Sequence, residues 1–220
     1  MSAKGILVLE CPWSDRIDEP KTVRPFIEGW AHLCEFPFSY RMYYDSATLS
    51  HWIRTFVMDD RLTVCYIAGH GKGGRLTGLL KNINLPSLAN VVRNNPKGSG
   101  RPGKGILFGA CDIGSSLEDF LNQCGRSIQW VAGYNKTVPW MESTVCDLLF
   151  LDYVLNGRIR RDNGLIAQGD TDKFSVQSTR SMQKIRDWVY QDMSLAQLLG
   201  FDVYESPHPA RHAAGSKKDR

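Results

Sequence analysis

Short apolar runs bounded by turn residues alternate along the chain with segments in which apolar residues recur at helical spacing. Four runs are almost continuously apolar, which is typical of strands buried on both faces. They are Gly5–Leu9, Leu62–Ala68, Ile106–Ala110 and Ile128–Ala132. Weaker patterns predict two more strands, at Tyr40–Tyr44 and Phe201–Tyr204. Strands that alternate with helices in this way predict a sheet covered by helices on both faces.

Helical spacing or capping-type residues mark the segments between these strands. The predicted helices are Val23–Cys34, Ser46–Met58, Leu85–Arg93, Ser115–Gln123, Met141–Leu155 and Thr179–Leu199. The expected fold class is therefore α/β, a three-layer α/β/α sandwich around a mostly parallel sheet of about six strands. We expect one domain over residues 1–204 and a disordered tail over 205–220, where Pro, His, Gly, Lys and Arg accumulate.

Composition narrows the class of protein further. Of the 220 residues, 42% are hydrophobic and 23% are charged, as in ordinary globular proteins, and neither a signal-peptide pattern nor a membrane-length apolar run is visible. The six cysteines stand singly, without a CxxC pair, which favours reduced thiols over disulfides or a zinc site. We therefore predict a cytoplasmic protein that has no membrane partner.

The net charge of +4 is distributed unevenly. No acidic residue occurs between Asp60 and Asp112, whereas basic residues recur there, so this stretch carries a positive field that could attract an acidic ligand. A solvated basic loop, centred on Asn94–Gly103, is the simpler interpretation. No aromatic residue lies between Lys72 and Lys104 to stack on bases, so we do not expect a nucleic-acid partner.

Two reactive residues follow buried strands. His70 comes two residues after the strand that ends at Ala68, and Cys111 directly follows the strand that ends at Ala110. The carboxyl ends of parallel strands meet at one edge of a sheet, so the two side chains should emerge together if the strands are neighbours. An imidazole beside a thiol makes it a nucleophile and later protonates a leaving amine. The backbone N–H groups of Gly71 and Cys111 are candidate oxyanion donors.

These motifs resemble a known family. Cys111 follows His70 by 41 residues, within the segment Gly109–Gly114, and caspases place a histidine at a similar distance before a Q-A-C-x-G segment. The chain resembles the caspase-like superfamily (clan CD), most closely the bacterial CHAT group, over about residues 5–157. The segments that carry the resemblance are Ala68–Gly71, Gly109–Cys111, Val131–Gly133 with Trp140, and Tyr153–Gly157.

The resemblance implies a cysteine peptidase without a cofactor or metal, with His70 as general base and acid and Cys111 as nucleophile. Such folds build substrate pockets after the first strand and near Trp140, which makes Asp15 and Trp140 candidate substrate-binding residues. Relatives that cut after basic residues usually carry an acid two positions before the cysteine. This chain has Gly109 there, so basic specificity is not supported.

The CHAT resemblance also implies a biological setting. Proteins of this group in bacteria act as effector proteases in antiviral defence or programmed death. A separate sensor activates them, and they cleave one dedicated protein substrate, sometimes a gasdermin-like pore former. An alternative from another class is a catalytically silent regulatory or scaffold module. The loop Asn94–Lys104 is additionally a candidate for self-cleavage.

Two glycine-rich segments imitate nucleotide-binding motifs. Gly69–Gly74 satisfies G-x-G-x-x-G after a strand, but we predict no helix after it, and the stretch up to Cys111 contains no acid to hold a ribose. Gly98–Lys104 nearly matches a phosphate-binding loop, but Gly105 replaces the Ser or Thr and the segment leads into a strand. We therefore expect neither segment to bind a nucleotide.

Overall fold

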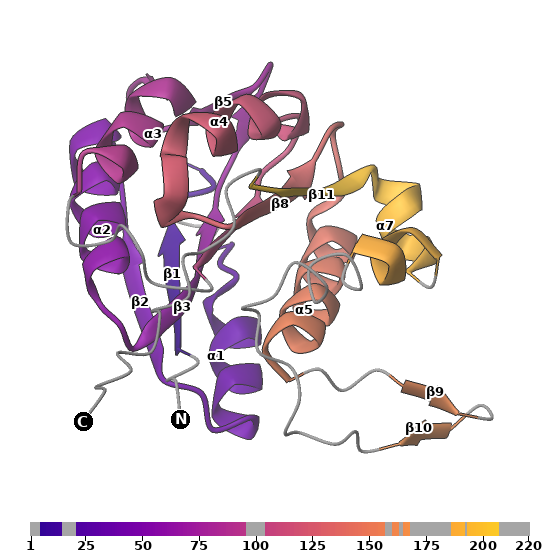
Figure 1. Cartoon of the computed structure of the whole chain (residues 1–220). Coiled ribbons are helices and arrows are strands. Elements are labelled where there is room, and N and C mark those ends of the chain that lie inside the picture. The colour runs from indigo at the N-terminus through magenta and orange to yellow at the C-terminus, as the bar shows by residue number, and fades with distance from the viewer. Residues whose placement is uncertain are drawn as a thin grey trace, which may run out of the picture.

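A six-stranded sheet in the order β11-β8-β7-β3-β1-β2 forms the centre of the computed structural model (Figure 1). The structure describes residues 5–14, 21–95, 104–156, 160–162, 165–167, 186–191 and 193–206. All neighbouring strands of the central sheet run parallel except β11, which is antiparallel to β8. The strands are β1 Gly5–Glu10, β2 Phe38–Met42, β3 Leu62–Ala68, β7 Gly105–Gly109, β8 Trp130–Tyr134 and β11 Phe201–Glu205.

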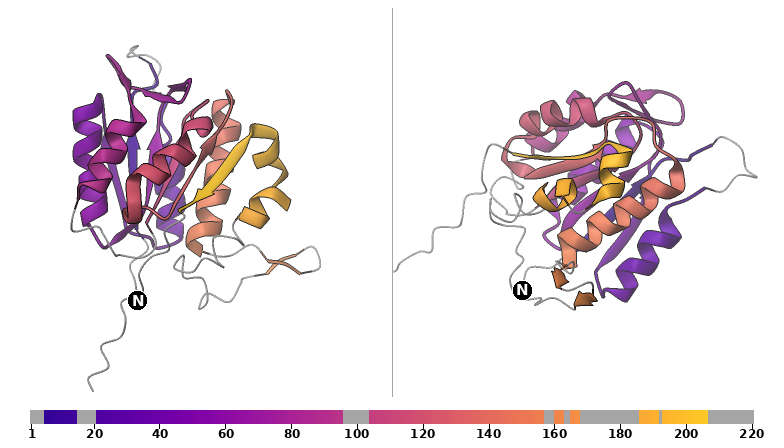
Figure 2. Two further views of the ribbon diagram at one scale, coloured as in Figure 1. Left: turned by 45° about the horizontal axis from the view of Figure 1, so that its top comes forward. Right: turned by 90° about the vertical axis from the view of Figure 1, so that its right-hand side faces the viewer.

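Helices cover both faces of this sheet, as Figure 2 shows from two further sides. One face carries α1 (Arg24–Leu33), α5 (Trp140–Asn156) and α7 (Ser194–Leu199), and the other carries α2 (Ser46–Met58), α3 (Leu85–Arg93) and α4 (Leu117–Cys124). Side chains of a strand point alternately to the two faces. In β1, Ile6 and Val8 join the core under α1 and α5, while Leu7 and Leu9 join the core under α2, α3 and α4. The predicted three-layer α/β/α sandwich is confirmed.

The differences from the predicted elements are local. The strands β2 and β8 lie two residues away from their predicted ranges, because the apolar runs continue past the paired residues. Ser116 occupies the predicted N-cap position of α4, but it makes no side-chain cap bond, and residues Gly114–Ser116 form a 3-10 turn before the helix. The described part of the predicted helix Thr179–Leu199 is divided into a helix over 186–191 and α7.

Two small sheets were not predicted. The strands β4 (Gly71–Lys72), β5 (Arg75–Thr77) and β6 (Asn82–Ile83) form an antiparallel sheet after His70, and β9 (Arg160–Asp162) pairs with β10 (Leu165–Ala167). These strands have two or three residues each. That length is too short to show hydrophobic alternation, which is why a sequence pattern does not reveal them.

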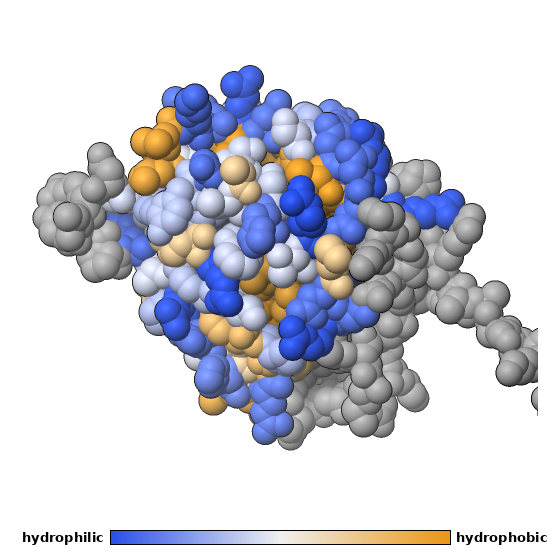
Figure 3. Space-filling model, turned by 90° about the vertical axis from the view of Figure 1, so that its left-hand side faces the viewer, coloured by the Kyte–Doolittle hydropathy of each residue, from blue (hydrophilic) through white to orange (hydrophobic). Residues whose placement is uncertain are grey.

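The outer surface on the side of α2 is largely hydrophilic, with apolar side chains in small separate groups (Figure 3). This is expected of a helix that buries one face, and α2 buries Leu49, Ile53, Phe56 and Val57. In the part of the chain that the structure describes, no helix combines the length and the apolar character needed to cross a membrane.

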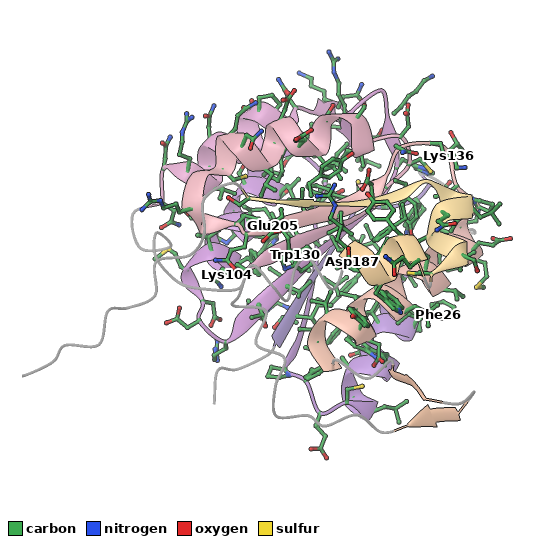
Figure 4. The ribbon with its side chains drawn as sticks, turned by 45° about the vertical axis from the view of Figure 1, so that its right-hand side comes forward. Phe26, Lys104, Trp130, Lys136, Asp187 and Glu205 are labelled. Carbon is green, nitrogen blue, oxygen red and sulfur yellow. The ribbon has the colours of Figure 1, made fainter. Side chains whose placement is uncertain are left out.

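Lys104 ties α2 to the sheet at its amino edge. Its ammonium group donates to the backbone carbonyls of Phe56, Asp59 and Leu62 at 2.8, 2.8 and 2.7 Å, and the side chain is only 3% exposed. Figure 4 shows Lys104 at the opposite end of the sheet from Lys136. Because its three donors are used within the core, Lys104 does not serve as the lysine of a phosphate-binding loop.

A buried carboxyl group joins α5 to two strands. Asp147 of α5 is 1% exposed and accepts hydrogen bonds from the hydroxyls of Tyr66 (β3) and Tyr134 (β8), each at 2.7 Å. Burial raises the pKa of Asp147 to about 7, although the two hydrogen bonds act to lower it. The cluster therefore places a titrating group beneath the sheet.

We predict that Asp147 makes the stability of the protein depend on pH between about 4 and 7. An unfolded aspartate loses its proton near pH 4, while the folded chain holds this proton until about pH 7. The free energy of unfolding should therefore fall as pH rises through this window, by up to about 1 kcal/mol per pH unit, and level off above it. Asp147→Asn should remove this part of the slope. Urea unfolding of the wild type and of Asp147→Asn across this pH window tests the prediction. If the free energies of unfolding of the two proteins change with pH in parallel, the prediction is wrong.

Candidate active site

The backbones that carry His70 and Cys111 are neighbours. The strands β3 and β7 pair in parallel, with Ala68 opposite Gly109, so His70 and Cys111 both stand two residues beyond a paired position. The N–H of Gly69 donates to the carbonyl of Gly109 at 3.4 Å and continues the pairing past the strand ends. Both residues thus emerge at the same level of the carboxyl edge, at the top of Figure 1.

The imidazole of His70 is oriented by Trp13, in the segment that follows β1. Its Nε2 lies 2.7 Å from the backbone carbonyl oxygen of Trp13. A carbonyl oxygen can only accept, so Nε2 carries the proton of this hydrogen bond and the neutral ring keeps Nδ1 as its acceptor. The indole of Trp13 also meets the imidazole edge to face, with ring centroids 5.3 Å apart. In this tautomer Nδ1 is the unprotonated nitrogen, which is what a general base requires.

The thiol of Cys111 lies against the loop between β8 and α5. The backbone N–H of Val138 points at the sulfur from 3.5 Å, and the carbonyl oxygen of Val138 lies 3.7 Å from it. The N–H of Val138 stabilises negative charge on the sulfur, whereas its carbonyl oxygen accepts from the neutral thiol. The side chain of Cys111 is only partly buried, so a reagent or substrate can reach it.

Four of the other cysteines are buried. Burial raises the pKa of Cys11 to about 11, and it raises the pKa of Cys65, Cys124 and Cys146 further still. A buried thiol that keeps its proton is a poor nucleophile. Cys34 is half-buried but lies at the end of α1 rather than at the carboxyl edge of the sheet.

In the hairpin that follows His70, the backbone of Gly71 lies very close to the backbone of Cys111. A Cβ atom at Gly71 would lie 2.3 Å from the carbonyl oxygen of Cys111, so only glycine fits. The N–H of Thr77 donates to the carbonyl of His70, which makes the neighbouring pair of Gly71 and Leu76 the non-hydrogen-bonded kind. The N–H of Gly71 consequently points away from β5, as a donor for an oxyanion must.

Asp112 connects three loops of the site. Its backbone is left-handed, with φ of 50°. Its carboxylate accepts from the N–H of Gly73 at 2.8 Å, its carbonyl accepts from the N–H of Gly74 at 2.8 Å, and its N–H donates to the carbonyl of Lys136 at 3.1 Å. Asp112 thus holds the hairpin of His70 and the loop after β8 against the loop of Cys111. Sequence reasoning missed this role, although aspartate directly after the candidate nucleophile is one of the residues that tolerate this backbone shape.

An aromatic row stands beside the pair. The ring of Trp140 meets those of Trp13 and Phe26 edge to face, with centroids 6.3 and 5.8 Å away. The structure therefore places the candidate substrate residue Trp140 next to the residue that orients His70, and it adds Phe26, which is 38% exposed. Sequence reasoning assigned Phe26 only to a helix. The other candidate, Asp15, lies outside the described residues.

The structure also bears on nucleotide and metal binding. The segment Gly69–Gly74 leads into β5 and not into a helix, so it lacks the helix N-terminus that holds a pyrophosphate. Most of the second segment, Gly98–Lys104, lies outside the described residues. Among the residues that are described, no three His, Cys, Asp or Glu side chains gather in a way that could hold a metal ion.

Comparison with known proteins finds similarity only among solved structures: no protein-family profile and no curated protein matches the chain. A secreted C11 cysteine protease from Bacteroides thetaiotaomicron, iotapain, shares 13% identity over 63% of this chain, with a TM-score of 0.39, and the match spans 54% of the protease chain. The structure of pro-sf-caspase-1 shares 15% identity, with a TM-score of 0.41, over 76% of this chain and 87% of its own.

We predict that Gly71→Ala forces the hairpin away from Cys111. The added methyl group would meet a backbone oxygen, which cannot rotate aside as a side chain could. The free energy of unfolding should fall by about 1–3 kcal/mol, as for other overpacked sites. Gly29→Ala in α1 is the matched control, because its methyl group would enter open space. Equal stability of the two variants in urea unfolding would contradict the close contact.

Proposed function

We propose that the chain is a cysteine peptidase of the caspase-like type, in which Cys111 is the nucleophile and His70 is the general base and acid. The observation that supports this most strongly is that β3 and β7 end at the same level of the carboxyl edge, each two residues before His70 or Cys111. There a backbone carbonyl accepts from Nε2 of the imidazole, so Nδ1 is the nitrogen that can take the proton of the thiol. A dyad needs a nucleophile, a base and a group that orients the base.

The proposed reaction has two stages. Nδ1 of His70 takes the proton of the Cys111 thiol, and the sulfur attacks the carbonyl carbon of the scissile bond. The N–H groups of Gly71 and Cys111 hold the oxygen that becomes negative. The imidazolium then protonates the leaving amine, the C–N bond breaks, and a thioester remains on Cys111. In the second stage His70 takes a proton from water, and the resulting hydroxide attacks the thioester carbon. The C–S bond breaks and releases the carboxylic acid, and the imidazolium returns its proton to the sulfur of Cys111.

The surroundings favour an apolar side chain of the substrate over a basic one. The aromatic row of Trp13, Trp140 and Phe26 offers an apolar surface beside the dyad. An acid at position 109 has no room, because a Cβ atom at Gly109 would lie 2.6 Å from the ring of Tyr66. Asp15 remains a candidate substrate contact on the basis of the resemblance.

The biological role follows from the resemblance to CHAT-type proteins. We assign the chain to bacterial antiviral defence or programmed death, as an effector that a separate sensor protein activates. Its expected substrate is one dedicated protein, with a gasdermin-like pore former as one possibility. The basic stretch after Asp60 offers a charged surface to an acidic partner, since Lys72 and Arg75 of the hairpin are exposed.

We predict that a thiol-reactive activity probe labels Cys111 and that His70→Ala lowers the labelling rate by about a hundredfold, the typical effect of losing a general base. Peptide mapping by mass spectrometry identifies the labelled cysteine. Cys34→Ser is the matched control, because it removes another half-buried thiol outside the site and should leave labelling unchanged. A folded wild type that labels no faster at Cys111 than the His70→Ala variant would favour the silent scaffold module instead.

We also predict that the purified chain alone cleaves a proteome-derived peptide library far more slowly than the chain mixed with lysate of its source cells. The resemblance to CHAT-type proteins implies activation by a separate sensor protein, which the lysate would supply. Cys111→Ala under the same conditions subtracts cleavage by other proteases, and mass spectrometry of the products reads out the cleavage sites. Full activity of the purified chain would contradict a requirement for an activator.

A further inference from the structure

Glu10, the last residue of β1, accepts four hydrogen bonds with its side-chain carboxylate. The residue is 1% exposed. One oxygen accepts from the indole N–H of Trp13 at 2.6 Å and from the backbone N–H of Val23 at 2.8 Å. The other accepts from the hydroxyls of Thr22 at 2.6 Å and Tyr40 at 2.7 Å. Four donors from three segments of the chain therefore converge on one side chain.

Trp13 connects the carboxyl group of Glu10 to the candidate active site. Trp13 is held by Glu10 through its indole, and the same residue accepts the hydrogen bond of His70 through its backbone carbonyl. The indole ring also contacts the imidazole and the ring of Trp140. A single residue thus links the buried carboxyl group to the candidate general base.

We propose that Glu10 is a positioning residue: by fixing Trp13, it holds the carbonyl that sets the orientation and tautomer of His70. The inference rests on the proposed function, because it assigns Glu10 a task in the dyad of His70 and Cys111. Backbone carbonyls in an irregular segment keep their place only when the segment is tied down. The described residues 11–14 are tied by this carboxyl group and by the bond from the N–H of Cys11 to the carbonyl of Ala68.

The chemistry of the four donors predicts which substitution is tolerated. The two N–H groups on one oxygen can only donate, whereas the two hydroxyls on the other can also accept. In Glu10→Gln, the amide oxygen can therefore face Trp13 and Val23 while the amide NH2 faces Thr22 and Tyr40. Burial raises the pKa of Tyr40, which keeps its hydroxyl protonated and able to adapt. Glu10→Leu offers no acceptor and leaves the two N–H groups unpaired.

The test is the rate at which iodoacetamide alkylates Cys111 at neutral pH, which needs no substrate. His70→Ala serves as the reference for complete loss of the base. We expect Trp13→Phe, which keeps the backbone carbonyl but loses the indole N–H, to lower the rate about tenfold, the lower range for lost supporting residues. The alkylation rate of Glu10→Leu should fall by at least as much, and the rate of Glu10→Gln should stay within about twofold of the wild-type rate.

Trp30→Phe is the matched control for Trp13→Phe, because it removes an indole N–H that donates to Asp152 at 3.1 Å, away from the site. It should leave the alkylation rate unchanged. If Glu10→Leu does not fold, the alkylation rates of Trp13→Phe and Glu10→Gln still test the positioning role of Glu10. A Trp13→Phe rate equal to that of the wild type, with a slow His70→Ala, would overturn the role of Glu10 alone. A His70→Ala rate equal to that of the wild type would overturn the proposed dyad itself.

Discussion

The parallel pairing of β3 with β7 is the constraint on which the rest of the site depends. Its register puts Ala68 beside Gly109, and the two chains leave the sheet at the same level, with His70 and Cys111 each two residues further on. The hydrogen bonds from the N–H groups of Gly73 and Gly74 to Asp112 join the two segments beyond the last paired residues. A one-residue slip in this register would turn the side chains to the opposite face of the sheet.

Three separate sets of contacts surround the ends of β3 and β7, where His70 and Cys111 lie. On one side, Glu10 and Trp13 fix the ring of His70 through a carboxyl group and a carbonyl. On another, Asp112 bonds to the hairpin and to the loop after β8 through its side chain and backbone. Beneath the sheet, the ring of Tyr66 fills the space that a side chain at position 109 would need. The reactive groups themselves can therefore be partly exposed while their supports are buried or bonded, which is the arrangement that precise chemistry requires.

Sequence reasoning predicts the layers of this fold and the meeting of the two strand ends, but not the supports. Continuous apolar runs and helical spacing carry a periodic signal, so the strands of Leu62–Ala68 and Gly105–Gly109 are predicted to within a residue. The carbonyl of Trp13 has no signature, because every residue has one, and Glu10 differs from a solvated strand-end acid only by what folds over it. Asp15 lies outside the described residues, so its assignment stays a prediction from sequence.

The central claim is that His70 and Cys111 form one chemical unit, and the nitrogen resonances of the His70 ring report on it directly. A long-range proton–nitrogen NMR spectrum, recorded across neutral pH for the wild type and for Cys111→Ala, separates Nε2 from Nδ1. We expect Nε2 to keep its proton in both proteins and the Nδ1 resonance to shift when the thiol is removed. Identical Nδ1 resonances in the two proteins would contradict the claim.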